Sequence, residues 1–245
     1  MVFEPNEKVK SKMLKDGNVL KYMYGVAGAG KGLIAGGAML VFVGLLLMVM
    51  LLQTFEMPQA LVAGGALAGP GVLLLILGVF LQKRRMDNWI KAYVKHTGLS
   101  EEDILKAAEE FKQPGTVLLS FEKGKDANSL KKMGFITKNY LKLPGVIPSM
   151  ARLDDVVACF FTKKFLCKDG GYDKAFIAYS KDEKMAYMNT GVSEKDGVEM
   201  AEAIAKRNPE IIKYHHFTYQ DKEYDAVRNM DEVIRLHSQV TGSKS

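Results

Sequence analysis

Two long stretches without a charged residue constrain this chain more than any other feature of its sequence. Residues 32–52 and 60–82 contain no Asp, Glu, Lys or Arg. At a rise of 1.5 Å per residue, a helix of either length extends about 30 Å, which matches the hydrocarbon core of a bilayer. The core helix of a soluble protein seldom contains so long an apolar run. The sequence therefore predicts two transmembrane helices, 32–52 and 60–82, joined by a short turn.

Two other interpretations of the N-terminal region fit less well. A cleaved signal peptide has an apolar segment of about 7–15 residues, whereas the first run here is longer and a second run follows it. Residues 25–31 have the spacing of a phosphate-binding loop, but Gly32 stands where a serine or threonine would bind magnesium. We therefore expect both helices to be retained in the mature protein, and we expect no nucleotide or other cofactor.

Basic residues flank the two predicted helices on one side only. The turn 53–59 contains none, whereas the segments before the first helix and after the second are rich in lysine and arginine. The positive-inside rule therefore predicts a two-span protein of the cell membrane with both termini in the cytoplasm. The residues expected to lie against anionic lipids of the inner leaflet are Lys8, Lys10, Lys12, Lys15, Lys21, Lys31, Lys83, Arg84 and Arg85. Nucleic acid is not expected, because no aromatic and basic platform accompanies these charges.

Small residues inside the predicted helices indicate close packing of one helix against the other. Stripes of residues four apart allow helix backbones to approach one another. The stripes are Gly28, Gly32 and Gly36; Gly65 and Gly69; and Ala60, Gly64 and Ala68. We expect the hairpin to pack on itself, and a stripe left unused would offer a surface for a homo-oligomer.

The sequence divides into five predicted parts. They are a basic N-terminal segment (1–31), the transmembrane hairpin (32–82), a juxtamembrane helical connector (83–114), a cytoplasmic domain (115–212) and a C-terminal strand and helix extension (213–245). Ser100 and Ser193 are each followed three residues later by Asp, a pattern typical of helix starts. Apolar runs at 116–121, 135–143, 155–163, 175–180 and 184–189, separated by turn residues, predict an antiparallel meander. The fold class is α+β, a sheet followed by a closing helix.

A set of short motifs follows a recognisable order in the cytoplasmic domain. The segment 135–141 (FITKNYL) precedes Ile147-Pro148 and the segment 153–157 (LDDVV), and these are followed by 182–184 (DEK) and 207–209 (RNP). This order, over 115–212, resembles bacterial membrane proteins in which a pleckstrin-homology-like (PH-like) domain follows two membrane helices. The resemblance implies a bent β-sheet closed by one C-terminal helix, and it implies no catalytic residues. The chain from Tyr214 onward is not part of that pattern.

Candidate chemical sites in the sequence are few. His215 and His216 lie near three carboxylates, Asp221, Glu223 and Asp225. Adjacent side chains on a strand point to opposite faces, so we expect at most one imidazole to join a carboxylate and predict no metal site.

The remaining reactive groups also lack partners in the sequence. The pair Asp154 and Asp155 has no second acidic pair or nucleophile motif beside it. Cys159 and Cys167 are expected to be free thiols in a reducing cytoplasm, because their spacing matches neither a redox pair nor a zinc site. None of these groups forms a recognisable catalytic constellation.

These observations leave three hypotheses about function. The first is a non-enzymatic, membrane-anchored binding or scaffold module that engages a protein partner or the inner leaflet. The alternative is a membrane-bound enzyme, which requires a cleft that gathers Asp154, Asp155, His215 and His216. A transporter or channel subunit would need polar groups within the membrane, and both predicted helices lack charge.

Overall fold

The computed structural model describes residues 1–25, 29–53, 56–121, 127–166 and 169–242. The chain forms two compact units. Gly25–Trp89 is the hairpin unit, and Met1–Tyr24 together with Ile90–Ser245 forms the α+β unit. Gly28 and Cys167, two residues named above, lie outside the described residues.

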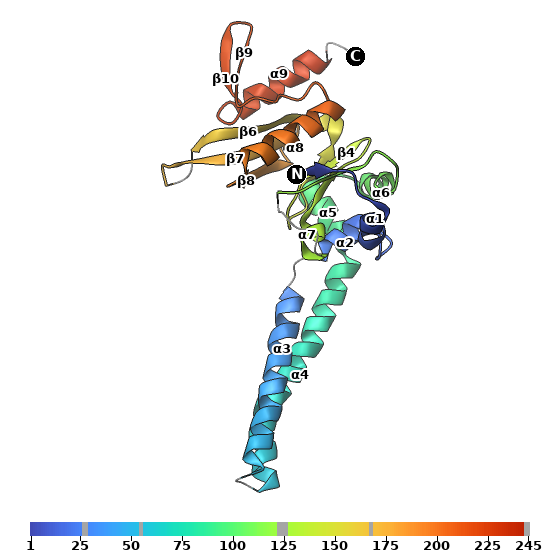
Figure 1. Cartoon of the computed structure of the whole chain (residues 1–245), viewed down its shortest axis with the longest axis vertical. Coiled ribbons are helices and arrows are strands. Elements are labelled where there is room, and N and C mark those ends of the chain that lie inside the picture. The colour runs from blue at the N-terminus through green and yellow to red at the C-terminus, as the bar shows by residue number, and fades with distance from the viewer. Residues whose placement is uncertain (26–28, 54–55, 122–126, 167–168, 243–245) are drawn as a thin grey trace. The chain divides into compact units, whose positions relative to one another are not determined.

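The hairpin unit consists of α3 (Ala29–Leu51) and α4 (Met57–Asp87), which lie side by side (Figure 1). Both helices are long and apolar enough to cross a membrane, as predicted. Only 11% of the most apolar window of α3 and 17% of that of α4 is buried, whereas the core helix of a soluble protein would be mostly buried. The helix α4 extends past the predicted end at residue 82 and includes the basic residues that follow.

Glycines spaced seven apart form the contact between α3 and α4. A Cβ on Gly37 would lie 2.7 Å from the carbonyl oxygen of Gly71, and one on Gly44 would lie 2.8 Å from that of Gly64. Gly30 and Gly78 meet in the same way. Seven residues make two helical turns, so these glycines follow one face of each helix.

The predicted four-residue glycine stripe is therefore wrong for this contact. Gly32, Gly36, Gly65 and Gly69 would each accept a Cβ with no atom within 4 Å. Every seventh residue returns to the same face of a helix that contacts one neighbour along its length, whereas a four-residue repeat drifts off that face. The predicted stripe around Gly64 does participate, because Gly44 contacts both Gly64 and Ala68.

Besides a two-stranded hairpin near its C-terminal end, the described part of the α+β unit contains two larger antiparallel sheets in which sequential strands pair. The first has the order β1 (Val2–Phe3), β2 (Val117–Leu119), β3 (Gly134–Ile136), β4 (Tyr140–Lys142) and β5 (Met150–Arg152). The second has the order β6 (Val156–Leu166), β7 (Tyr172–Ser180) and β8 (Ala186–Thr190). The short 3-10 helix η1 (Leu153–Asp155) joins the sheets. This arrangement confirms the predicted antiparallel sheets, although the predicted strand 135–143 is two strands, β3 and β4.

The two helices predicted from their serine caps are present. Ser100 caps α6 (Glu101–Glu110) and Ser193 caps α8 (Glu194–Arg207), each by accepting the backbone N–H of the aspartate three residues later. The helix α8 follows the second sheet and packs on β6, so the α+β class is confirmed. The remaining helices are α1 (Glu7–Met13), α2 (Val19–Tyr24), α5 (Trp89–Thr97), α7 (Ala127–Lys132) and α9 (Met230–Gly242).

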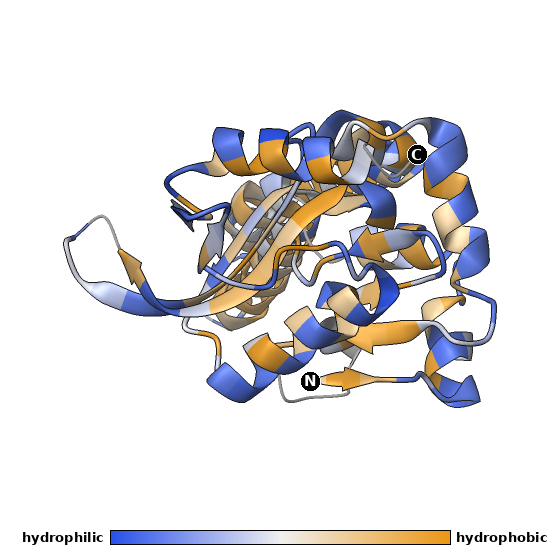
Figure 2. Cartoon of the chain, turned by 90° about the horizontal axis from the view of Figure 1, so that it is seen from above, coloured by the Kyte–Doolittle hydropathy of each residue, from blue (hydrophilic) through white to orange (hydrophobic). Residues whose placement is uncertain are grey.

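Most of β6 and β7 in the second sheet is buried on both faces, whereas β8 is partly exposed. One face packs under α8, in a cluster that includes Cys159, Met200 and Ile204. The other face, with Phe160, is covered by the C-terminal segment, which forms the hairpin β9 (His216–Tyr219) and β10 (Lys222–Asp225) followed by α9. In Figure 2, the helices α8 and α9 are coloured as apolar on one side and hydrophilic on the other. The apolar sides cover the sheet.

The division into units differs from the predicted domain boundaries at 31, 83, 115 and 213. The N-terminal segment belongs to the α+β unit, because β1 pairs with β2 and because Met13, Leu20 and Met23 are buried. The chain after residue 213 also packs into this unit through Val233. Long-range pairing, which leaves no local pattern in the sequence, accounts for both differences.

Candidate functional site

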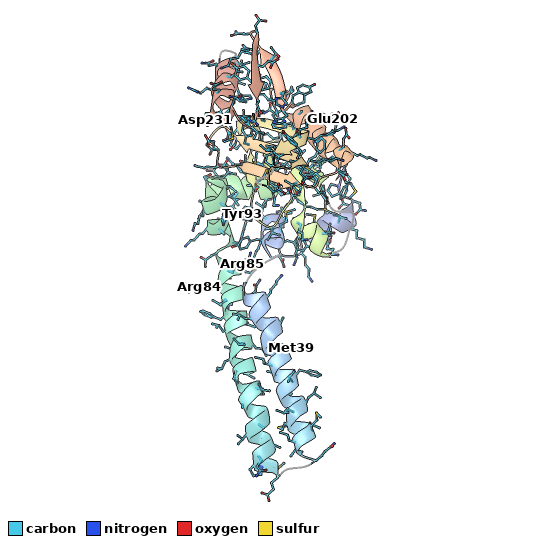
Figure 3. The ribbon with its side chains drawn as sticks, turned by 90° about the vertical axis from the view of Figure 1, so that its left-hand side faces the viewer. Met39, Arg84, Arg85, Tyr93, Glu202 and Asp231 are labelled. Carbon is cyan, nitrogen blue, oxygen red and sulfur yellow. The ribbon has the colours of Figure 1, made fainter. Side chains whose placement is uncertain are left out.

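Four of the predicted basic residues lie at one end of the hairpin unit. Lys31 is in the first turn of α3, and Lys83, Arg84 and Arg85 are in the last turns of α4. Because Gly30 contacts Gln82, these ends lie together. Arg84 and Arg85 are labelled in Figure 3. The opposite end, where α4 begins, carries Glu56 and no basic residue.

The five N-terminal lysines belong to the α+β unit. Lys8, Lys12 and Lys15 are exposed, whereas Lys10 and Lys21 are half-buried. The Lys10 ammonium donates a hydrogen bond to the carbonyl oxygen of Gln113. Of the apolar residues between these lysines, Met13, Val19 and Leu20 are buried in the unit and are not available to a membrane, whereas Val9 and Leu14 are half-buried. The lysines are therefore surface charges of a folded unit, not of a free segment.

The four residues of the enzyme hypothesis are not gathered in one cleft. Asp154 lines a cavity of about 690 Å³ beside α9, together with His237. His216 lines a different cavity, of about 520 Å³. Asp155 ends η1, where its backbone carbonyl accepts the N–H of Lys181. The cleft that this hypothesis requires is absent from these described residues.

A different cluster brings together His215, His216 and Asp225. Their candidate ligand atoms all lie within 4.8 Å of one another. His215 Nε2 lies 3.1 Å from Asp225 Oδ1, and the two imidazole centroids are 4.1 Å apart. The expectation that the imidazoles point to opposite faces is wrong, because only His216 is in strand β9 and His215 lies in the bend before it.

Neighbouring groups hold this cluster in place. Thr162 Oγ1 lies 2.9 Å from His215 Nδ1, and the ring of Phe160 stacks on the His215 ring at 5.6 Å between centroids. Asp225 Oδ1 accepts the backbone N–H groups of Val227 and Arg228, each at 2.9 Å. These contacts fix both partners of the His215–Asp225 pair.

The electrostatic setting favours a neutral imidazole beside an ionised carboxylate. Burial lowers the pKa of His215, and the attraction of Asp225 offsets only part of this effect. Burial alone would raise the pKa of Asp225, but the N–H donors of Arg228 and Val227, together with the attraction of the two histidines, leave that pKa below its ordinary value. A neutral imidazole and a carboxylate are the forms that bind metal ions.

A buried lysine, Lys142, was not singled out by the sequence. Its side chain lies within the first sheet, 2% exposed, and donates to the carbonyl oxygens of Met133 at 3.0 Å and Leu143 at 3.2 Å. Burial lowers the pKa of Lys142 to about 7. It lines neither of the two cavities described above.

Comparison of the chain with protein families, with curated proteins and with solved structures found no match in any of the three. Two features of this chain's own geometry bear on its function. They are the charge distribution and packing of the hairpin unit, and the cluster of His215, His216 and Asp225 in the α+β unit.

Proposed function

We propose that this chain is a non-enzymatic, membrane-anchored binding or scaffold module. The helices α3 and α4 cross the cell membrane, and the α+β unit works at its cytoplasmic surface. The observation that carries the proposal is that the hairpin unit has small residues inside and large apolar residues outside. Glycines line the contact between the helices, while large apolar side chains are exposed on the outer surface, among them Met39, Phe42, Met50, Val62, Leu73, Ile76 and Phe80.

This packing is unfavourable in water and favourable in lipid. Leaving a Leu, Ile, Phe or Met side chain exposed to water costs about 1.5–3 kcal/mol relative to burying it. Figure 3 labels Met39 on α3, whose side chain is 69% exposed. Lipid tails would cover this outer surface, and the close approach of the two backbones is the packing mode typical of membrane helices.

The charges at one end of the hairpin support its orientation. Lys31, Lys83, Arg84 and Arg85 would lie in the cytoplasmic headgroup layer, and Glu56 at the outer surface. Both termini then belong to the cytoplasm. Each lysine or arginine near an anionic leaflet contributes about 1 kcal/mol.

The element order of the α+β unit supports a PH-like binding domain. Sequential antiparallel strands β2 to β8 are followed by α8, which is the sheet and closing helix that the resemblance implies. The separation of Asp154 from His216 favours binding over catalysis. The partner is a protein or the anionic lipids of the inner leaflet.

Reporter fusions and alkaline extraction of the full-length protein test the anchor. We expect fusions at both termini to report the cytoplasm, and a fusion in the turn 53–59 to report the outside. The protein should stay in the membrane fraction at pH 11. Release at alkaline pH would contradict the anchor, and termini on opposite sides would contradict the hairpin.

Two further measurements test the binding role. Full-length protein in detergent is used to capture partners, and the isolated α+β unit described in the Discussion is tested for flotation with vesicles with and without anionic lipid. Flotation that requires anionic lipid, or a partner captured reproducibly, supports the proposal. If no partner is captured and flotation does not depend on anionic lipid, the binding role proposed for the α+β unit is contradicted.

A further inference from the structure

We infer that His215, His216 and Asp225 form a binding site for one divalent transition-metal ion, with Zn²⁺ as the probe. The inference goes beyond the proposed function, which assigns no metal to the α+β unit. It rests on the positions of these side chains on the hairpin β9–β10 and on the groups that hold them.

The spacing of the donor atoms suits a tetrahedral ion. With metal–ligand bonds of about 2.0–2.1 Å, neighbouring ligand atoms of a tetrahedral site lie about 3.3 Å apart. His215 Nε2 and Asp225 Oδ1 are already 3.1 Å apart. The third donor lies within 4.8 Å of both, and His216 is exposed, so a rotation of its side chain can close the remaining gap.

The backbone explains why three donors converge here. His216 and Asp225 are directly opposite one another in the antiparallel hairpin, so their side chains share a face. His215 lies in the bend before β9, and its backbone carbonyl accepts the N–H of Ala226 at 2.7 Å. Because His215 is outside the strand, its side chain need not point to the face opposite that of His216, and the two rings lie side by side.

Thr162 can form a hydrogen bond with His215 Nδ1 both without and with a bound metal ion. Without metal, Nε2–H donates to Asp225, and Nδ1 accepts a hydrogen bond from the Thr162 hydroxyl. With metal on Nε2, the ring proton moves to Nδ1, and the same hydroxyl oxygen accepts it, because a threonine hydroxyl is both donor and acceptor. Metal-binding histidines commonly have such an outer partner, which fixes the ring orientation.

The donor set selects the class of ion. Two imidazole nitrogens and one carboxylate oxygen suit Zn²⁺ and other first-row transition ions, whereas Mg²⁺ and Ca²⁺ prefer oxygen ligands only. Three protein ligands leave a fourth position for water or an external ligand. His216 and Asp225 line the cavity of about 520 Å³, which gives this position access to solvent. Glu223 lines the same cavity and adds negative charge.

A purely structural His215–Asp225 hydrogen bond is the competing explanation. Arg228 Nε lies 3.8 Å from Asp225 Oδ2, so the carboxylate also has a cationic neighbour. This explanation gives no role to His216, which is exposed and whose replacement would leave the pair intact. The dependence of metal binding on His216 therefore separates the two explanations.

Equilibrium dialysis of the full-length protein in detergent against Zn²⁺ tests the site, with Co²⁺ absorption reporting the coordination. We expect one ion per chain. His216→Gln and Asp225→Asn should each weaken binding by at least about 10-fold, and Thr162→Val by about 10- to 100-fold, the range for outer partners of metal ligands. His96→Gln changes an exposed histidine on α5 and should leave the affinity unchanged.

The control for folding is the thermal unfolding midpoint of each variant. His216→Gln changes an exposed side chain and should retain the wild-type midpoint, so its loss of affinity reports the ligand alone. Absence of a stoichiometric Zn²⁺ ion would overturn the inference. Binding that persists in His216→Gln and Asp225→Asn would also overturn it, because the ion would then lie elsewhere.

Discussion

Single glycines decide whether α3 and α4 can approach each other. In Gly37→Ala, the added Cβ would lie 2.7 Å from the carbonyl oxygen of Gly71 and 2.9 Å from the backbone nitrogen of Leu75. Real Cβ atoms do not approach backbone so closely, so the helices must separate. Because overpacking typically costs about 1–3 kcal/mol, we expect this loss of stability in the hairpin, measured by titration with SDS from a mild detergent.

The neighbouring glycine supplies the control for this substitution. Gly36 has no atom within 4 Å of the position of a Cβ, so Gly36→Ala adds a methyl group on the outer surface of α3. Its SDS unfolding midpoint should equal or slightly exceed that of the wild type, since alanine favours the helix over glycine. Equal losses in the two variants would contradict the contact between the two helices.

The buried Lys142 makes the stability of the α+β unit depend on pH. Its pKa in the folded protein is about 7, below the ordinary value of 10.5. Between these values the unfolded chain binds a proton that the folded protein has lost, so the free energy of unfolding rises with pH. The increase is at most about 1.4 kcal/mol per pH unit in this window. Below about pH 7 both states hold the proton, and this contribution to the slope disappears.

Urea unfolding at pH 7 and pH 9 measures the effect of Lys142. All ten tyrosines lie outside the hairpin unit, so their near-UV circular dichroism reports the α+β unit. Lys142→Met should remove most of the gain in unfolding free energy between the two pH values. Lys138→Met, at an exposed position after β3, should retain the wild-type gain. If Lys142→Met kept the wild-type gain in unfolding free energy, Lys142 would not be the source of the pH dependence.

The histidine pair shows where reasoning from sequence succeeds and fails at this scale. The sequence identifies His215, His216 and Asp225 as neighbours along the chain, which is a local property. Whether the imidazoles converge depends on the first residue of β9, and strand ends cannot be placed within one residue from sequence. The contact of Thr162 with His215 joins residues 53 apart and has no local signal.

At the scale of elements, Glu110 fixes the end of α6 to the turn between β3 and β4. Its carboxylate accepts hydrogen bonds from the Thr137 hydroxyl at 2.8 Å, the Asn139 backbone N–H at 2.9 Å and the Asn139 side-chain amide at 2.6 Å. Since removal of one partner leaves polar groups unsatisfied at about 1–3 kcal/mol, we expect Glu110→Ala to lower the unfolding free energy by that amount, measured by urea unfolding.

The adjacent glutamate is a matched control of the same charge on the same helix. Glu109 is exposed and forms an ion pair with Lys112 three residues later. Because exposed pairs of this kind contribute about 0.5 kcal/mol or less, Glu109→Ala should change the unfolding free energy little. If the two variants lost equal stability, the attachment of α6 to the β3–β4 turn would not be the cause.

Elements that depend on local signals were predictable, and elements that depend on distant pairing were not. The caps Ser100 and Ser193 lie within three residues of the N–H groups that they accept, so both helices could be predicted. The strand β1 has only two residues, and its partner Leu119 is more than a hundred residues away. A turn divides the predicted strand 135–143, because the backbone N–H of Thr137 donates to the carbonyl oxygen of Tyr140.

At the scale of the whole molecule, the hairpin unit is an insertion in a discontinuous α+β unit. The two sides of the insertion meet, because the rings of Tyr24 and Tyr93 are 6.0 Å apart and the Tyr93 hydroxyl donates to the Leu20 carbonyl oxygen at 3.4 Å. The α+β unit has its own buried clusters. A unit with its own core and adjacent ends can fold without the insertion.

Replacing residues 25–89 by a short Gly-Ser linker should therefore give a water-soluble, folded α+β unit. It retains β1 and the buried side chains of Met13 and Leu20, so its tyrosine circular dichroism and its Zn²⁺ affinity should equal those of the full-length protein. A fragment that begins at residue 90 loses these groups and exposes the edge of β2, so we expect it to unfold at lower urea or to aggregate. Equal stability of the two proteins would show that residues 1–24 are dispensable, and aggregation of the linked unit alone would show that the α+β unit requires its hairpin.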